Sequence, residues 1–532
     1  RVVYPDTTAP VEVVLTAYDY FRMGVAEFAK MRWSACIFDE AHKLKNHRAK
    51  LYEAACELPQ TRRFGLTGTA MQNSYDELFN LMDWACPGCL GEKKPFKLFY
   101  CRTMQQAQRF DVDERTLGLG RQRADALSRL LKKYLLKRTK AKVLAGQLPV
   151  KQDNVVFCEL SPLQTRVYRR LIESADFQVL VRHAELCDCG SGVQRSRCCY
   201  AAPTGPPEGA PIWHSLDHDT HVGRGGEPMC PYCMCLLCIN ILAKISNHLE
   251  LLKPNPKDPP EKFERDHAVA KLAFGEDAHL MGSVDRVDNN YDRMAAATNC
   301  GKLLALEKLL ALWHRANDKV LLFSCSVRLL DILETFLVRR GYVSCRLDGN
   351  TPQRERQKLV DDFNKSSSLF IFLLSTKAGG VGLNITSANR VVIFDPNWNP
   401  ALDLQAQDRA YRIGQQRDVD VYRFLTSGTL EEIVYQRQVY KQQQSNMALD
   451  AVKERRYFEG VQGDKEHQGE LFGLSNMFAL ASENVRMQEL VARENRAARD
   501  FYRIEKVGHA SAGNEAPLGA KRQGRGGGGE GE

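Results

Sequence analysis

Residues 319–324 read K-V-L-L-F-S, and this short apolar run is the first of a series that decides the fold. Similar runs follow at residues 343–349 (V-S-C-R-L-D-G), 370–375 (F-I-F-L-L-S), 390–395 (R-V-V-I-F-D) and 419–424 (V-D-V-Y-R-F). Short apolar runs that alternate with helical segments are typical of a parallel sheet covered by helices. Leu329, Leu333 and Phe336 recur at helical spacing after the first run and give one such helix an apolar face. The sequence therefore predicts an α/β fold with a doubly wound parallel sheet.

The N-terminal part of the chain repeats this style in an incomplete form. We expect strands near residues 11–16, 34–38 and 62–66. Three strands are too few for a complete sheet of this kind. We therefore expect the rest of this first lobe to lie upstream of Arg1.

The length and the changes of composition indicate several domains. A chain of 532 residues is long enough for about two to four of them. We divide it into residues 1–119, the C-terminal part of the first lobe; 120–182, a protrusion read as helices; 183–296, a cysteine-rich insertion; 297–445, the second lobe; 446–507, a C-terminal extension; and 508–532, a glycine-rich tail expected to be disordered.

Charge and hydropathy limit the classes of partner. The net charge of +9, from 74 Lys+Arg against 65 Asp+Glu, permits a polyanionic partner without requiring one. No apolar stretch reaches the roughly 18 residues of a membrane span, and no signal peptide follows Arg1. We therefore expect an intracellular protein with no membrane partner.

Two acids and a histidine, Asp39, Glu40 and His42, follow the expected strand at residues 34–38. In open α/β sheets ligands bind beyond the carboxyl ends of the strands. One acid there can hold hydrated Mg²⁺ while its neighbour orients an attacking water molecule. The alternative is a polar start of a helix, with Asp39 as its N-cap. The phosphate-binding loop G-x-x-x-x-G-K-[ST] that usually accompanies such acids occurs nowhere in the 532 residues.

Two patterns in the second lobe suit phosphate binding. Glycines let a backbone approach a phosphate closely, and three of them stand at Gly379, Gly380 and Gly382. Arg409 and Arg412 are three residues apart, so on the helix that we expect there they share one face and can reach phosphates held by the other lobe. Each pattern alone is also common in turns and on solvated helix faces.

These residues belong to an ordered set of motifs. In the first lobe they are D-E-A-H (39–42), L-T-G-T-A-M-Q-N (66–73) and N-S-Y-D-E-L-F-N-L-M-D-W (73–84). In the second lobe they are L-D-G-N-T-P-Q-R-E-R-Q (347–357), S-T-K-A-G-G-V-G-L-N (375–384), D-P-N-W-N-P (395–400) and Q-A-Q-D-R-A-Y-R-I-G-Q (405–415). The set resembles the motifs of the Swi/Snf-type DNA-dependent ATPases, a branch of the superfamily-two helicases. Ala70 is a departure, since family members usually carry proline there.

The resemblance implies two RecA-like lobes, the first incomplete, that bind ATP and Mg²⁺. Asp39 would hold magnesium, Glu40 would activate water, His42 would couple the lobes, and Arg409 and Arg412 would be arginine fingers. Further nucleotide-site residues would be Thr67, Gly68, Thr69, Gln72, Gly379, Gly380, Gly382, Gln405 and Asp408. DNA contacts would come from Lys43, Lys45, Asn73, Thr376, Lys377, Trp398 and Asn399, mostly to backbone phosphates. For Trp398 the alternative is a core residue, and for the lysines it is solubility.

The spacing of the cysteines in the insertion predicts a zinc site. Its first cysteine group, C-D-C-G-S-G-V-Q-R-S-R-C-C, resembles the SEC-C zinc knuckle, and two close thiolate pairs can complete a tetrahedral site. This group consists of Cys187, Cys189, Cys198 and Cys199. A second group, Cys230, Cys233, Cys235 and Cys238, offers a possible second site, although its last two members open an apolar helix and suit a core equally well. Alternatives are reduced, unliganded cysteines and substitute ligands from His214, His218 and His221.

Two further segments, I-S-N-H-L-E-L-L-K-P (245–254) and G-V-Q-G-D-K-E-H-Q-G-E-L-F-G-L (460–474), resemble a narrower group. It contains the Cockayne-syndrome-B-like proteins, with the Hebo-type DNA-repair helicases and the plant SWITCH-type proteins nearest. The resemblance implies a nuclear, ATP-dependent double-stranded DNA translocase in DNA repair or chromatin remodelling. Nucleosomes and repair or transcription proteins are further possible partners. Since the phosphate loop is absent, we expect the chain alone to be inactive. The hypothesis that competes with the DNA translocase is a non-catalytic nucleic-acid- or protein-binding scaffold. An RNA helicase is a third interpretation.

Overall fold

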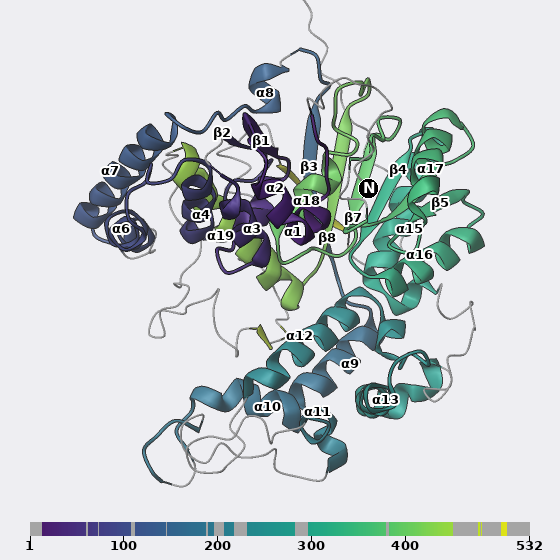
Figure 1. Ribbon diagram of the computed structural model, residues 1–532. Coiled ribbons are helices and arrows are strands. Elements are labelled where there is room, and N and C mark those ends of the chain that lie inside the picture. The colour runs from purple at the N-terminus through teal and green to yellow at the C-terminus, as the bar shows by residue number, and fades with distance from the viewer. Residues whose placement is uncertain are drawn as a thin grey trace, which may run out of the picture.

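The computed structural model describes two α/β lobes and a helical unit (Figure 1). The described residues are 13–59, 62–72, 74–107, 112–144, 146–187, 190–195, 207–216, 231–281, 296–378, 382–450, 477, 478, 480 and 502–507. Among them, no helix has the length and apolar character needed to cross a membrane.

The second lobe is built on a seven-stranded sheet in which every neighbouring pair is parallel, in the order β5-β6-β4-β7-β8-β3-β9. Its strands are β3 (Lys151–Cys158), β4 (Val320–Ser324), β5 (Ser344–Leu347), β6 (Ile371–Ser375), β7 (Arg390–Ile393), β8 (Val419–Thr426) and β9 (Tyr502–Val507). Its helices are α15 (Gly301–Arg315), α16 (Val327–Arg339), α17 (Gln353–Lys365), α18 (Pro400–Gln407) and α19 (Leu430–Asp450), with a short turn of 3₁₀-helix, η9, at Ala297–Asn299. All five strands expected after residue 318 are confirmed.

Alternate residues of β4 face opposite sides of this sheet, as the strand period requires. Leu322 packs in one core with Leu333 of α16, and Phe323 packs in another with Phe363 of α17. Both faces are therefore covered by helices, and the doubly wound arrangement predicted for this lobe is confirmed.

One strand of this sheet, β3, comes from the segment at residues 120–182 that was predicted to be helical. β3 lies next to β8, with Lys151 opposite Val419 and Cys158 opposite Thr426. The reading of residues 120–182 as helices is therefore wrong at 151–158. The run N-V-V-F-C at residues 154–158 carries β-branched and aromatic residues, and all five of its residues are buried. That run was the available signal for a strand.

The first lobe contains a two-stranded parallel sheet made of β1 (Ala35–Phe38) and β2 (Arg62–Gly65). Both strands confirm predictions, whereas the strand expected near residues 11–16 is wrong for its described part, because residues 13–16 form no strand. On this sheet the exposed fractions of Ile37 and Phe64 are 66% and 52%. The remaining elements of the N-terminal part are α1 (Tyr18–Met23), α2 (Val25–Ala29), η1 (Ala41–Leu44), α3 (Lys50–Glu57), α4 (Tyr75–Ala85), α5 (Lys93–Phe96), η2 (Lys97–Arg102), α6 (Thr103–Ala107), α7 (Glu114–Leu131) and α8 (Lys140–Val143).

A helical unit lies between β3 and α15 in the sequence and below the large sheet in Figure 1. Its elements are α9 (Pro162–Glu173), α10 (Ala175–Val181), η3 (Arg182–Ala184), η5 (Pro207–Gly209), α11 (Pro211–His214), α12 (Pro231–Asn247), η7 (Leu249–Leu252), α13 (Pro260–Phe274) and η8 (Gly275–Met281). These helices share one apolar core, which Leu430 and Val434 of α19 join. The cysteine-rich insertion is thus partly built into a packed helical unit.

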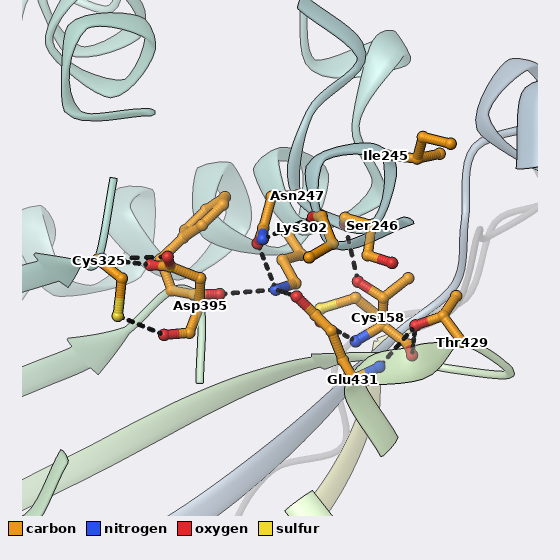
Figure 2. A network of polar contacts seen from close by, with 12 residues as sticks. Cys158, Ile245, Ser246, Asn247, Lys302, Cys325, Asp395, Thr429 and Glu431 are labelled. Carbon is orange, nitrogen blue, oxygen red and sulfur yellow. Dashed lines mark hydrogen bonds and ion pairs between the residues drawn. The ribbon is translucent and has the colours of Figure 1, made fainter. Parts of the chain in front are cut away.

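A buried ammonium joins this unit to the second lobe (Figure 2). The side chain of Lys302, at the start of α15, has no exposed area. Its Nζ donates to Asn247 Oδ1 at 2.8 Å, to the Phe394 carbonyl at 2.7 Å and to Glu431 Oε1 at 2.7 Å. Because these acceptors belong to α12, to the residue that follows β7 and to α19, one side chain joins three parts of the chain around the start of the D-P-N-W-N-P loop.

Candidate nucleotide site and lobe interface

The two acids lie directly after β1, as the sequence predicts. The backbone of Glu40 is left-handed, with φ 51° and ψ 46°, which is uncommon for a residue with a Cβ. Asp39 Oδ1 accepts the Glu40 amide at 2.9 Å, and η1 begins at Ala41 with no side-chain cap. The alternative in which Asp39 caps a helix is therefore wrong. A strained backbone at this point fits a functional segment.

His42 connects these acids to the next motif. Its Nδ1 lies 3.2 Å from Glu40 Oε2 and 3.2 Å from Thr67 Oγ1. Burial lowers the pKa of His42, and Glu40 acts in the opposite direction. Glu40 Oε2 is shielded from solvent and, among the described residues, accepts no well-aligned hydrogen bond. An acceptor in that state suits a carboxylate that orients water.

The second motif is folded on itself by its hydroxyl and amide groups. Thr67 Oγ1 accepts the Thr69 amide at 3.2 Å, and Gln72 Nε2 donates to Thr69 Oγ1 at 3.0 Å. The Gln72 amide donates to Glu77 Oε2 at 3.0 Å. A continuous series of polar contacts therefore runs from Glu40 through His42 to Gln72. Gly68 lies exposed in the same loop.

Gln72 is also the point at which the two lobes meet. It is 8% exposed, and its Oε1 accepts Lys45 Nζ at 2.7 Å and Asn399 Nδ2 at 3.1 Å. Lys45 follows the acids of the first lobe, whereas Asn399 caps α18 of the second by accepting the Ala401 amide at 3.1 Å. Two residues predicted to contact DNA thus converge on one residue predicted for the nucleotide site.

The loop that carries Asn399 is held by one face of α19. Gln438 Nε2 donates to Asp403 Oδ2 at 2.8 Å and also to the Asn397 carbonyl. Lys441 Nζ donates to the Trp398 carbonyl at 3.0 Å. The far end of α19 reaches α7, where Ser128 donates to the Leu449 carbonyl at 3.4 Å. The helix therefore supports the loop and contacts the N-terminal part of the chain.

A pocket of about 210 Å³ opens beside this interface. Residues 68–72 of the first lobe, residues 399–401 of the second lobe and Lys441 of α19 contribute to its walls. Its walls come from both lobes, so its shape depends on how the lobes are placed.

The two motif arginines do not share a helix face, contrary to the prediction from their spacing. α18 ends at Gln407, so Arg409 and Arg412 lie in the turns that follow, and the prediction of their helical setting is wrong. Arg409 is 8% exposed; burial and then Arg412 lower its pKa, while Asp408 and Glu40 act in the opposite direction. Arg409 is therefore within electrostatic reach of Glu40 in the other lobe.

The neighbours of Arg409 are engaged by other parts of the chain. Arg412 donates to the Leu383 carbonyl at 3.1 Å, and Asp408 pairs with Lys140 of α8 at 2.5 Å. Gln405 is partly buried on α18. Gly382 has φ 59°, a conformation that favours glycine, while Gly379 and Gly380 lie outside the described residues.

The remaining residues predicted to contact DNA differ in their exposure. Lys43 and Lys377 are exposed, and Trp398 is 38% exposed with the Arg437 guanidinium 5.5 Å from its ring. Thr376 is buried, with its amide donating to the Ser324 carbonyl at 2.9 Å. Asn73 lies outside the described residues. Among the described members of this set, the two lysines and the tryptophan are open to a nucleic acid.

The predicted zinc ligands are only partly described. Cys235 and Cys238 are 9% and 0% exposed in the apolar core of the helical unit, and burial raises the pKa of both thiols. They are core residues, the alternative that the sequence left open. Cys189, Cys198, Cys199, Cys230, His218 and His221 lie outside the described residues, as does the side chain of Cys233. In the part of the chain that the structure describes, no three His, Cys, Asp or Glu side chains are grouped to hold a metal ion.

One described segment next to the first cysteine group forms a tight turn. The Cys187 amide donates to the Val193 carbonyl at 2.8 Å, and the Gly190 amide donates to the Cys187 carbonyl at 3.3 Å. Gly190 and Gly192 have φ 76° and 70°. The chain therefore turns tightly after Cys187, which the two glycines allow.

Sequence reasoning missed Lys302, Gln438 and Lys441, which fix the loop that carries Asn399. A lysine or glutamine in a helical segment is normally read as a solvated residue. Gln438 and Lys441 are three residues apart, but that spacing does not say which loop the helix face meets. No local signal distinguishes these residues.

Two family models match the chain, an SNF2-related domain at residues 2–191 and a helicase conserved C-terminal domain at residues 301–414. Switch 2 of Arabidopsis thaliana is 50% identical over 481 residues, which cover 90% of this chain and 55% of that protein. The DNA excision repair protein ERCC-6-like 2 of Mus musculus is 39% identical over 472 residues, 89% of this chain and 29% of that protein. DNA excision repair protein ERCC-6 of Homo sapiens is 32% identical over 451 residues, 84% of this chain and 25% of that protein.

The chain thus spans about half the length of Switch 2 and less of the other two. Among solved structures, the C-terminal part of the Fun30 ATPase domain superposes with a TM-score of 0.39 at 24% identity, over 57% of this chain and 100% of that chain. A superposition this loose does not permit a comparison of sites.

Proposed function

Since the chain carries an SNF2-related domain followed by a helicase conserved C-terminal domain, it belongs to the Swi/Snf-type proteins, and from this premise we propose that it is part of an ATP-dependent double-stranded DNA translocase. The observation that carries the proposal is the contact between motif residues of the two lobes, in which Gln72 Oε1 accepts Asn399 Nδ2 at 3.1 Å. The polar series from Gln72 leads back to Glu40, whose carboxylate lies 3.2 Å from His42. Glu40 is also among the charges that act on the pKa of Arg409 in the second lobe. Such an arrangement is expected of a site that hydrolyses a nucleotide between two lobes.

The residues divide the chemistry among them. Mg²⁺–ATP, when bound, supplies the phosphoryl group and the charge to be neutralised. Asp39 is exposed at the end of the strand, and carboxylate oxygens are ligands that Mg²⁺ prefers. The Asp39 carboxylate therefore fits this ion. Glu40 orients water and takes its proton, and Arg409 balances negative charge from the opposite lobe.

The polar series from Glu40 to Asn399 offers a route from hydrolysis to movement. A change at Glu40 alters the partner of His42, and the contacts of Thr67, Thr69 and Gln72 pass the change to the lobe interface. Opening and closing of that interface would move the lobes along DNA. Lys43, Lys377 and Trp398 would hold the DNA backbone, so binding would weaken as salt is raised.

ATP hydrolysis by the full-length gene product tests the proposal. We expect duplex DNA to stimulate ATP hydrolysis more than RNA does, and Glu40→Gln to abolish the stimulated activity. Glu53→Gln, an exposed acid on α3 of the same lobe, is the matched control and should leave the activity unchanged. Stimulated hydrolysis that survives Glu40→Gln would contradict the mechanism. Stronger stimulation by RNA would favour the RNA helicase instead.

A non-catalytic scaffold is the second candidate, and one observation favours it. No phosphate-binding loop G-x-x-x-x-G-K-[ST] occurs in the 532 residues. Duplex DNA binding without any ATP hydrolysis by the full-length gene product would select this candidate.

We also propose a zinc site at Cys187, Cys189, Cys198 and Cys199, a role in DNA repair or chromatin remodelling, and a nuclear location. The tight turn after Cys187 supports the first, and the names of the DNA excision repair relatives support the others. Elemental analysis of protein purified without chelator should find about one zinc per chain. Cys187→Ser should lower that content, and an unchanged content would count against the site.

A further inference from the structure

Tyr18 contacts the segment of the proposed catalytic acids from outside the motifs. It belongs to α1, and its hydroxyl donates to the backbone carbonyl of Asp39. Its ring lies 5.6 Å from the ring of Phe38, the last residue of β1, and Lys43 Nζ lies 5.1 Å from its centre. The side chain is therefore held in place beside the strand end by ring packing as well as by its hydroxyl.

The carbonyl that accepts this hydrogen bond belongs to the peptide that joins Asp39 to Glu40. The amide of the same peptide donates to Asp39 Oδ1 at 2.9 Å. On the other side of Glu40, the Ala41 amide donates to the Leu66 carbonyl at 2.8 Å. Both peptides that flank Glu40 are therefore fixed by hydrogen bonds.

Such fixing is needed because Glu40 adopts φ 51° and ψ 46°. A residue with a Cβ stays in this left-handed region only when its surroundings hold it there. In this conformation Glu40 Oε2 lies 3.2 Å from His42 Nδ1.

We propose that Tyr18 is a positioning residue whose hydroxyl holds the peptide between Asp39 and Glu40, and thereby keeps Glu40 in its left-handed conformation and aims its carboxylate at His42. The geometric part of this inference concerns the chain alone. Its consequence for hydrolysis rests on the function proposed above, in which Glu40 orients water.

The protonation state of Tyr18 agrees with this role. Burial, with smaller effects of Asp39 and Glu40, raises the pKa of Tyr18 to about 12. The phenol is therefore protonated at neutral pH and remains a hydrogen-bond donor.

Tyr18→Phe removes one oxygen atom and keeps the ring against Phe38. Tyr20→Phe on the same helix is the matched control, since Tyr20 is 69% exposed. In crystals of this chain without nucleotide, we expect Tyr18→Phe to move residue 40 out of the left-handed region and Tyr20→Phe to leave it there.

The titration of His42, followed by NMR in the same chain, gives a second readout. The groups that act on the pKa of His42 besides burial are Glu40, Lys45, Lys43 and Glu77. Since Glu40 raises this pKa, Tyr18→Phe should lower it, in the same direction as Glu40→Gln. Tyr20→Phe should leave it unchanged.

The hydrolysis assay adds a kinetic readout. With the full-length gene product we expect Tyr18→Phe to lower kcat by roughly 2- to 10-fold, the range of one hydrogen bond, with KM for ATP unchanged. An unchanged conformation of residue 40, together with an unchanged His42 titration where Glu40→Gln shifts it, would overturn the inference. Failure of the proposed function would look different, because Glu40→Gln itself would then retain activity.

Discussion

The side-chain amide of Asn399 donates to Gln72 Oε1 across 3.1 Å, which joins the second lobe to the first. Lys45 donates to the same oxygen at 2.7 Å. At this point the two lobes therefore meet through polar side chains that belong to two motifs.

If this contact transmits hydrolysis to movement, Asn399→Ala should lower DNA-stimulated kcat by roughly 2- to 10-fold, the effect of one hydrogen bond. Gln72→Ala should lower it at least as much, because that change also removes the acceptor of Lys45. In a double-mutant cycle the combined variant should lose less than the product of the two single losses. Losses that simply multiply would show that the two side chains act independently.

Loss of the Lys302 ammonium should destabilise the second lobe. Lys302→Met leaves Glu431 buried without its cation, and removing one partner of a buried pair costs about 3–5 kcal/mol. Thermal unfolding of the chain should therefore begin at a lower temperature. Lys308→Met, at an exposed position of the same helix, is the control and should have little effect.

The double variant Lys302→Met with Glu431→Gln refines this prediction. It removes both charges, so we expect it to be more stable than Lys302→Met alone. A double variant that is no more stable would indicate that the ion pair is not the reason for the loss.

Cys238→Ser should weaken the helical unit without removing zinc. The hydroxyl would be buried in an apolar core, which costs about 1–3 kcal/mol when no partner is near. The measurements are the unfolding temperature and the zinc content. Cys56→Ser, at an exposed cysteine, should change neither. A Cys238→Ser protein of normal stability that has lost zinc would return Cys238 to the set of ligands.

Asp277 should make the helical unit sensitive to acid. Hydrogen bonds from Arg166, and also from Arg170, lower the pKa of Asp277 to about 2. Because this pKa is below the unfolded value, the stabilisation is present above about pH 4 and is lost as the pH falls towards 2. Hydrogen exchange of α9 and α13 should show this loss in the wild type.

Asp277→Asn is the matched variant for that measurement. It should exchange faster than the wild type at pH 5, and the two proteins should become alike near pH 2. A difference that stays constant over this range would mean that the charge of Asp277 is not the cause.

The sequence by itself determined five of the seven strands described in the second lobe, β4 to β8. The runs at β4, β6 and β7 are mostly apolar, because strands covered on both faces bury nearly all of their side chains; Arg390, at the start of β7, is the charged and partly exposed member. The two acids after β1 were placed correctly for a related reason, since a polar residue after an apolar run marks the end of a strand. These features depend on neighbours along the chain, and the sequence records neighbours directly.

Predictions from local patterns were wrong or left open where the same sequence pattern is compatible with two different local structures. The run at β3 was read as part of a helical segment, and the spacing of Arg409 and Arg412 suggested a helix face although α18 ends at Gln407. Cys235 and Cys238 have the spacing of a metal-binding pair and of a buried helix face. Only packing against the other helices made them core residues.

Contacts between distant residues were decided by the tertiary structure alone. Gln72 and Asn399 are 327 residues apart, and Lys302 and Glu431 are 129 apart. The hydroxyl of Tyr18 reaches the Asp39 carbonyl only because α1 packs beside β1. A sequence fixes which groups can donate and accept, whereas the packing of the lobes decides which of them meet, because burial forces each polar group to find a partner nearby.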